Sequence, residues 1–261
     1  MSENFRVSVS KTKTFLDCKA KFKYCYIEKL PRKDWDFHIF GKFCHLVLEE
    51  FHLAYINGSD LPYHAVMSTS YKKALLEFGS KMTPEMKKEC WSIIDNYLKM
   101  VSIEKNNGRP ANVIAVEKRF EIVVDDKFVL NGAIDRIQLD DDGIVHVGDY
   151  KTVKNKKYLK DDYFQLLTYA YVLMKEDPTI ELVRGSYILL RYDFECITTS
   201  FQRDEVMKVE QKYIEYVDQM LTEQQFKANP TALCRFCDYS NVCPEGKKSL
   251  EPSKTYGEVS W

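Results

Sequence analysis

The sequence predicts an α/β fold in which a central sheet is flanked by helices. Apolar runs typical of strands lie at 113–124, 130–139, 144–150, 182–191 and 196–201. Between the third and fourth runs, residues 160–175 place apolar side chains at helical spacing, after Asp161 or Asp162 as a cap. One face of this helix is therefore expected to pack against the sheet.

Length and composition indicate one large globular domain. The chain has 261 residues, of which 45% are hydrophobic and 30% charged, values typical of soluble proteins. No apolar run approaches the ~20 residues that cross a bilayer. The segment Met1–Arg6 lacks the apolar core of a signal peptide. We therefore expect a cytoplasmic protein without a membrane partner.

The charge is balanced overall but locally basic. The 38 basic and 39 acidic residues give a net charge of −1, which argues against coating duplex DNA through overall charge. Residues 11–33 and 151–160 are nevertheless rich in lysine. Each run is either a solvated face or a surface that meets a phosphate backbone, and the position of the second run, directly after candidate active-site residues, favours the phosphate.

Helical patterns fill the first part of the chain. Residues 8–28 predict a helix that begins near Ser8 or Ser10, both good N-caps. A second helix is predicted at 40–56.

Residues 62–106 are also helical in pattern, with Pro84 at a favourable first position, and 106–110 read as a loop. This region carries no recognisable chemistry and is expected to be a helical insert. A further long helix is predicted at 204–226.

Polar residues occupy matching places in a predicted hairpin. Asp135 lies within the run 130–139, Asp149 and Lys151 end the next run, and the turn signal at 140–143 joins them. Antiparallel pairing would place the two carboxylates side by side, where they repel unless a cation binds. Mg²⁺ and Mn²⁺ prefer oxygen ligands. Lys151 shares the strand face of Asp149, so the set is suited to metal-assisted phosphodiester hydrolysis.

A group of three cysteines near the end of the chain indicates a metal. Cys234, Cys237 and Cys243 have x2 and x5 spacing, and Pro244 follows. Three thiolates leave a four-ligand site one short, and Cys18 is the natural fourth. The spacing alone leaves an iron–sulfur cluster, zinc and simple buried thiols open. The other cysteines are most simply small core residues: Cys25, Cys44, Cys90 and Cys196.

The ordered motifs resemble the RecB-type branch of the PD-(D/E)XK nuclease superfamily. They are Gly132-Ala133-Ile134-Asp135, then Asp149-Tyr150-Lys151, then Gln165 with Tyr169. An isolated Asp-x-Lys is common by chance, whereas the ordered set is more specific. The resemblance implies a restriction-endonuclease-like core with a mixed central sheet.

The resemblance also implies roles for individual residues. His45, followed by an apolar pair and Glu49, matches the family's first motif. His45, Asp135, Asp149 and the backbone carbonyl of Tyr150 would bind Mg²⁺ or Mn²⁺.

Lys151 would position or activate water, and Gln165 and Tyr169 would position the substrate strand. A glutamate such as Glu117 gives related enzymes an extra metal or water contact. Glu49 and His52 share the helix face of His45 and are expected to pack or support it.

The cysteine pattern resembles the iron–sulfur nucleases of the AddB and CRISPR-associated RecB-like types. The resemblance implies a structural [4Fe–4S] cluster on Cys18, Cys234, Cys237 and Cys243, with zinc as the alternative occupant. Lys19 stands where the family usually has proline.

The expected function is cleavage of DNA, most simply as an exonuclease on single strands or ends, in recombination and repair. A recombination or CRISPR-type protein partner is compatible with this function, and the oligomeric state is left open. The alternatives are a catalytically silent nucleic-acid-binding protein, a zinc-stapled adaptor and an RNA nuclease. The expected layout is a single nuclease domain over 1–261. It begins with an N-terminal helix and the first cluster cysteine at 1–39, followed by a helical region at 40–110 and a catalytic core at 111–202. A C-terminal helix and the cysteine cluster follow at 203–244, and a tail at 245–261.

Overall fold

A computed structural model describes residues 5–103, 112–156, 159 and 162–250. The predicted loop at 106–110, Asp161, three residues of the second basic run and the last eleven residues of the predicted tail lie outside this part. The chain divides into two compact units. The terminal unit comprises Met1–Asp34, Glu121–Gly132 and Glu210–Trp261, and the central unit comprises Trp35–Phe120 and Ala133–Val209.

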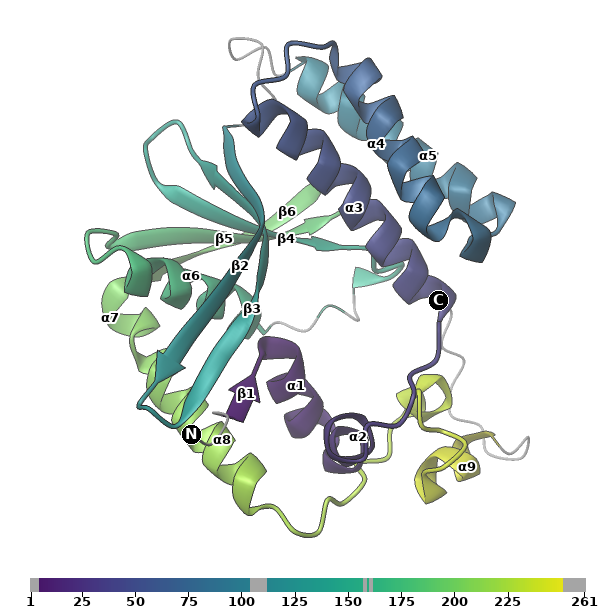
Figure 1. The fold of residues 1–261 in the computed structure, drawn as a ribbon, viewed down its shortest axis with the longest axis vertical. Helices are drawn as coiled ribbons and strands as arrows, with labels where there is room; N and C mark the ends of the chain where they lie inside the picture. Colours follow the sequence, from purple (N-terminus) through teal and green to yellow (C-terminus); the bar gives the residue numbers. More distant parts are fainter. Residues whose placement is uncertain (1–4, 104–111, 157–158, 160–161, 251–261) are drawn as a thin grey trace. The chain divides into compact units, whose positions relative to one another are not determined.

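Six strands form one mixed sheet (Figure 1). The strands are β1 (Phe5–Val7), β2 (Val113–Val124), β3 (Phe128–Leu139), β4 (Val145–Lys151), β5 (Leu182–Leu189) and β6 (Glu195–Gln202). Their order is β1-β3-β4-β5-β6, and β2 also pairs with β3. The β3–β4 and β5–β6 pairs are antiparallel, whereas β1–β3 and β4–β5 are parallel. The predicted α/β class with a mixed central sheet is confirmed.

Helices of the central unit cover both faces of β4 and β5 (Figure 1). They are α3 (Asp36–Ile56), α4 (Tyr63–Phe78), α5 (Pro84–Ile103), α6 (Phe164–Glu176) and α7 (Arg203–Val206). Tyr150 and Ile188 belong to a buried core that α3, α4 and α5 build. Asp149 and Gly185 lie on the other face, where they meet Gln165 and Leu166 of α6, because successive strand residues point to opposite faces.

The terminal unit is built from both ends of the chain. Its helices are α1 (Val9–Asp17), α2 (Lys19–Phe22), a π-helix at Lys23–Ile27, most of α8 (Lys208–Thr222), a 3₁₀-helix at Ala232–Phe236 and α9 (Pro244–Leu250). The side-chain amide of Asn229 donates to the carbonyl of Asp17 at 3.0 Å, and the ammonium of Lys33 donates to the hydroxyl of Ser240 at 2.9 Å. These contacts join the N-terminal segment to the last segment.

Two predictions about this unit need correction. The expected single helix at 8–28 is broken at Cys18, whose backbone is extended with φ −161° and ψ 107°. The thiol of Cys18 accepts the amide of Lys21 at 3.5 Å and so caps the next short helix. In addition, residues 245–250 of the expected loose tail are helical, since they form most of α9.

Membrane-spanning helices were not expected, and none is found in the ranges described above. There, no helix combines the length and the apolar character that crossing a bilayer requires.

Candidate active site

The β3–β4 hairpin places two carboxylates beside each other. Arg136 pairs with Gly148 in the antiparallel register, so Asp135 and Asp149 are the next residues along the two strands. The backbone amide of Tyr150 donates to Asp135 Oδ2 at 3.0 Å. The predicted hairpin is therefore confirmed, and it brings Asp135 to the end of β4.

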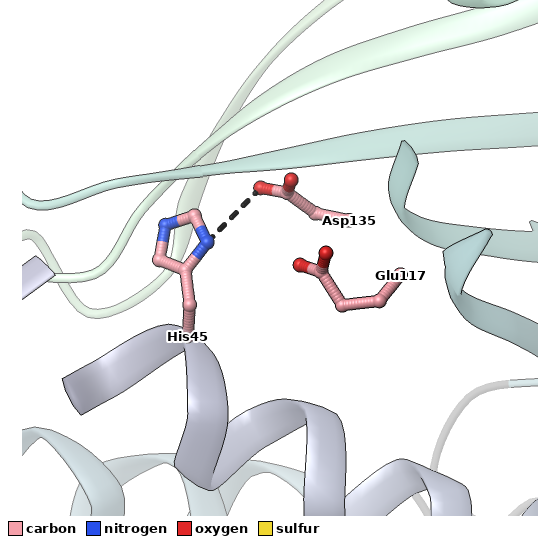
Figure 2. A group of neighbouring side chains, drawn as sticks. All are labelled: His45, Glu117 and Asp135. Carbon is pink, nitrogen blue, oxygen red and sulfur yellow. Dashed lines mark ion pairs between the residues drawn. The ribbon is translucent and has the colours of Figure 1, made fainter. Parts of the chain in front are cut away.

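Helix α3 adds His45 to this group (Figure 2). His45 Nε2 lies 3.0 Å from the backbone carbonyl of Tyr150, and His45 Nδ1 lies 3.4 Å from Asp135 Oδ2. His45 is half-buried. The imidazole thus faces a carbonyl oxygen and a carboxylate oxygen at once.

Glu117 completes a compact set of potential ligands. One ligand atom each from His45, Glu117 and Asp135 lies within 4.8 Å of the others, and the carboxylate of Glu117 points toward the other two side chains (Figure 2). Glu117 has φ +44° in the middle of β2. A left-handed backbone is costly for a residue other than glycine, and such irregularities in strands re-aim side chains.

Burial and crowding make the site electrostatically unfavourable without a cation. Burial, followed by the charge of Asp149, raises the pKa of Asp135 well above its usual value of 3.8. Burial, followed by the charge of Glu49, raises the pKa of Glu117. Burial lowers the pKa of His45, which favours the neutral, metal-binding imidazole.

The geometry fits a hard divalent cation. In an octahedral shell with metal–ligand bonds of about 2.1 Å, neighbouring ligand atoms are about 3 Å apart. The contact between His45 Nδ1 and Asp135 Oδ2, at 3.4 Å, is close to that spacing. The other ring nitrogen, Nε2, faces the Tyr150 carbonyl at 3.0 Å, and an N–H that donates to this carbonyl leaves Nδ1 as the ligand atom. The donor set of oxygens with one imidazole also suits Mg²⁺ or Mn²⁺.

A second network lies beside the ligands and is built on Asp149. This side chain is almost fully buried, at 2% exposure of the residue. Lys151 Nζ lies 2.5 Å from Asp149 Oδ2 and donates to Gln165 Oε1 at 3.1 Å. Gln165 Nε2 donates to Asp149 Oδ1 and, at 2.8 Å, to the hydroxyl of Tyr169.

All residues predicted to act in hydrolysis are therefore brought together within the central unit. Asp149 is not one of the three residues with close ligand atoms in Figure 2, and its oxygens contact Lys151 and Gln165. The spacing of Gln165 and Tyr169 on α6 directs both toward Asp149.

The remaining polar residues of α3 differ from one another. His52 is buried and its Nε2 lies 2.6 Å from the hydroxyl of Tyr97, so it belongs to the helical core as predicted. Burial raises the pKa of Glu49, with a further contribution from Glu50. Since the charge of Glu49 also raises the pKa of Glu117, Glu49 adds to the repulsion among the crowded carboxylates.

The four cysteines of the predicted cluster all belong to the terminal unit and form no disulfide. Burial is the main cause of a raised pKa at Cys237, and Cys18 contributes to the shift, so the first and last parts of the chain bring these thiols into electrostatic reach. Within the described part of the chain, no three of the four sulfurs lie within 4.8 Å of one another. The donor types suit an iron–sulfur cluster or zinc.

The other cysteines only partly match the prediction of core residues. Cys44 and Cys90 are buried, with their sulfurs 3.3 Å apart. Cys25 is half-buried and accepts from Arg32 Nη2 at 2.8 Å. Cys196 is exposed, so its interpretation as a core residue was wrong: it lies on the edge strand β6.

Two aromatic residues beside the site were not foreseen from the sequence. Tyr187 is the direct partner of Asp149 in the parallel β4–β5 register, and the ring of Tyr163 stacks against it. Only the pairing of distant strands shows this arrangement.

Comparisons with known proteins give a family and a fold. The model of the PD-(D/E)XK nuclease superfamily matches residues 6–244. A solved structure named "Putative exonuclease" from Eubacterium rectale is 11% identical, with 97% of this chain and 90% of that chain covered and a TM-score of 0.50. A crystal structure of SSO0001 is 17% identical over 94% of this chain and 88% of that one, with a TM-score of 0.43. Comparison with curated proteins gives no match.

Proposed function

Because the chain belongs to the PD-(D/E)XK nuclease superfamily, whose nucleases use divalent metals, we propose that it is an Mg²⁺- or Mn²⁺-dependent deoxyribonuclease. Its substrate is single-stranded DNA or a DNA end, cleaved as by an exonuclease. The observation that supports this most directly is the convergence of His45, Glu117 and Asp135 next to Lys151, which pairs with the buried Asp149.

These residues divide into metal ligands and residues that orient the reacting groups. His45 and Asp135 would hold the cation, with Asp149 and Glu117 as the further carboxylates. The Tyr150 carbonyl would join them by exchanging its contact with His45 Nε2 for the cation. When bound, the cation supplies an acidified water and offsets charge on the phosphate.

Lys151 is the cationic group of the second network. Its ammonium is held by Asp149 and Gln165, a position from which it can orient the attacking water and donate to a phosphate oxygen as negative charge develops. Gln165 and Tyr169 hold the Asp149 carboxylate and so fix the orientation of this pair.

The test is digestion of end-labelled linear and circular DNA, single- and double-stranded, with Mn²⁺ or Mg²⁺. Lys151→Ala is expected to lower the cleavage rate by about 10²-fold or more while the protein stays folded. Lys99→Ala is the matched control, because Lys99 is exposed on α5 and pairs with Asp95. If Lys151→Ala cleaves DNA at the wild-type rate, the role assigned to Lys151 is refuted. A parallel digestion of labelled RNA covers the alternative: cleavage of RNA without cleavage of DNA would assign the substrate to RNA.

The four cysteines support a second part of this proposal, a structural [4Fe–4S] cluster on Cys18, Cys234, Cys237 and Cys243. All four are free thiols, and they come from the two segments that already contact each other in the terminal unit. Thiolate bonds to one cluster would add a covalent link between those segments.

The occupant is identified by iron, acid-labile sulfide and zinc analysis after anaerobic purification. Cys237→Ala is expected to lose iron and sulfide and to unfold at lower temperature, whereas the exposed Cys196→Ala is expected to keep both. Stoichiometric zinc without sulfide would assign the site to zinc instead. A Cys237→Ala variant of unchanged metal content and stability would contradict any metal at this position.

A further inference from the structure

A row of aromatic rings extends from the candidate active site along the sheet. Tyr187 lies opposite Asp149 in the β4–β5 register and is buried, at 3% exposure. Its hydroxyl donates to the carbonyl of Asp162 at 2.8 Å. The ammonium of Lys151 lies 5.0 Å from the centre of the Tyr187 ring. Its burial and this hydrogen bond thus fix Tyr187 beside Asp149 and Lys151.

Tyr163 continues this row from the first position before α6. Its ring is nearly parallel to that of Tyr187, with an interplanar angle of 11° and ring centres 6.2 Å apart. Tyr163 is only half-buried, although Tyr187 behind it is closed off. Tyr163 is also two residues before Gln165, so the same helix start that orients Asp149 sets the position of this ring.

The Tyr163 ring is held by its stack on the Tyr187 ring. A half-buried ring stacked on the aromatic neighbour of Lys151 resembles the aromatic platforms on which single-stranded nucleic acids stack their bases. Tyrosine suits that role because its ring has two χ angles to immobilise and presents a flat apolar face.

We propose that Tyr163 is a stacking platform for an unpaired base of the strand whose phosphate lies at Lys151. The inference rests on the proposed nuclease function and makes its substrate class specific. A base inside a duplex has both faces covered by its neighbours, so only an unpaired or splayed base can present a face to Tyr163. Tyr163 therefore selects single strands or frayed ends. It does not contact the reacting atoms, which are bound by the metal ligands and Lys151.

The experiment measures binding without cleavage. Oligodeoxythymidylates with one 2-aminopurine at successive positions are titrated with wild-type protein in EDTA, and fluorescence quenching locates the stacked base. Tyr163→Ala is expected to bind about tenfold more weakly and to lose the quenching, whereas Tyr163→Phe keeps both because it retains the ring. Tyr55→Ala is the control: Tyr55 is half-buried on α3, ten residues after His45, and its hydroxyl donates to the Leu61 carbonyl.

A matched substrate change tests the same contact without altering the protein. An abasic site at the quenched position should weaken wild-type binding about tenfold and should leave Tyr163→Ala binding unchanged, since interacting pairs are not additive. Equal losses in both proteins, or a Tyr163→Phe variant as weak as Tyr163→Ala, would overturn the inference.

The stacking role and the nuclease function are refuted by different results. A wild-type protein that stacks the base but never cleaves DNA with Mn²⁺ would overturn the nuclease assignment alone. Normal cleavage with no effect of Tyr163→Ala on binding, quenching or strand preference would overturn the stacking role alone.

Discussion

At the scale of single residues, the carboxylates that could bind a cation lower the folding stability of the metal-free protein. Asp135 is half-buried next to Asp149 and Glu117, and burial together with these neighbours raises its pKa. An acid whose folded pKa is raised destabilises the folded state once pH exceeds its unfolded pKa, and the penalty is complete above the folded pKa. At neutral pH the metal-free carboxylate group therefore opposes folding.

Asp135→Asn is accordingly expected to stabilise the metal-free protein. In EDTA, the wild-type protein should lose stability relative to the variant as pH rises above the usual aspartate range near 3.8. With Mn²⁺, the wild-type melting temperature should rise and that of the variant should not. Thermal unfolding over a pH series measures both effects, with Asp95→Asn as the control at an exposed carboxylate. An equal Mn²⁺ response in the two proteins would exclude Asp135 as a ligand.

The sequence predicted some of these residues and missed others for physical reasons. The strand parity of Asp149 and Lys151 and the turn signal at 140–143 follow from local chemistry, so the hairpin was foreseeable. Glu117 was named as a candidate, but its left-handed backbone has no sequence signature, because a non-glycine residue at φ +44° is sustained only by its surroundings.

At the scale of elements, the placement of α6 depends on a close approach to β5. A Cβ atom at Gly185 would lie 2.8 Å from Cε2 of Phe201 and 3.0 Å from Cβ of Leu166. The first contact is tighter than real Cβ atoms make, so a side chain at this position has to displace the Phe201 ring and press on Leu166 of α6. Because Gln165 is the neighbour of Leu166 on α6, pressure on Leu166 is expected to disturb the Asp149–Lys151 pair.

Gly185→Ala is for this reason expected to cost about 1–3 kcal/mol of stability, as overpacked cores do, and to lower cleavage at temperatures where the variant is folded. Chemical denaturation and the cleavage assay on the same samples test this. Gly79→Ala is the matched control, since a Cβ there would meet Leu75 at 3.4 Å, an ordinary contact. Unchanged stability in Gly185→Ala would mean that α6 does not depend on this approach.

Elements near the start of the chain were harder to predict. Residues 8–28 keep a helical alternation of aromatic residues and lysines, yet the chain turns extended at Cys18 and then forms a five-residue π-helix. The break follows from contacts with the distant last segment, such as the amide of Ala20 donating to the Lys227 carbonyl at 3.3 Å. The parallel pairing that sets Tyr187 beside Asp149 is equally non-local.

At the scale of the whole molecule, the first and last segments fold into one unit. The ring of Phe22 stacks on Phe226, and Lys19 forms an ion pair with Glu223. The hydrogen bond and charge of Lys19 hold the pKa of Glu223 at about 2 instead of its usual 4.5. The ion pair therefore stabilises the folded state above pH 4.5, and this stabilisation is lost as pH falls toward 2.

Lys19→Met is expected to return the pKa of Glu223 toward the ordinary glutamate range. NMR titration of the side-chain carboxyl measures the change directly, and Lys29→Met is the control because it leaves the Lys19–Glu223 pair in place. A pKa that stays near 2 in Lys19→Met would show that the two segments are not joined by this pair.

The division of the chain has a consequence for its synthesis. Everything assigned to hydrolysis lies between His45 and Tyr169, and the central unit ends at Val209. On the ribosome, the reaction centre can therefore assemble while the last segment, which contacts Lys19 and Phe22, is still untranslated. Until that segment emerges, β1 can pair with β3 but Phe22 lacks its stacking partner Phe226. The N-terminal helices of the nascent polypeptide then expose apolar surface that a chaperone can cover.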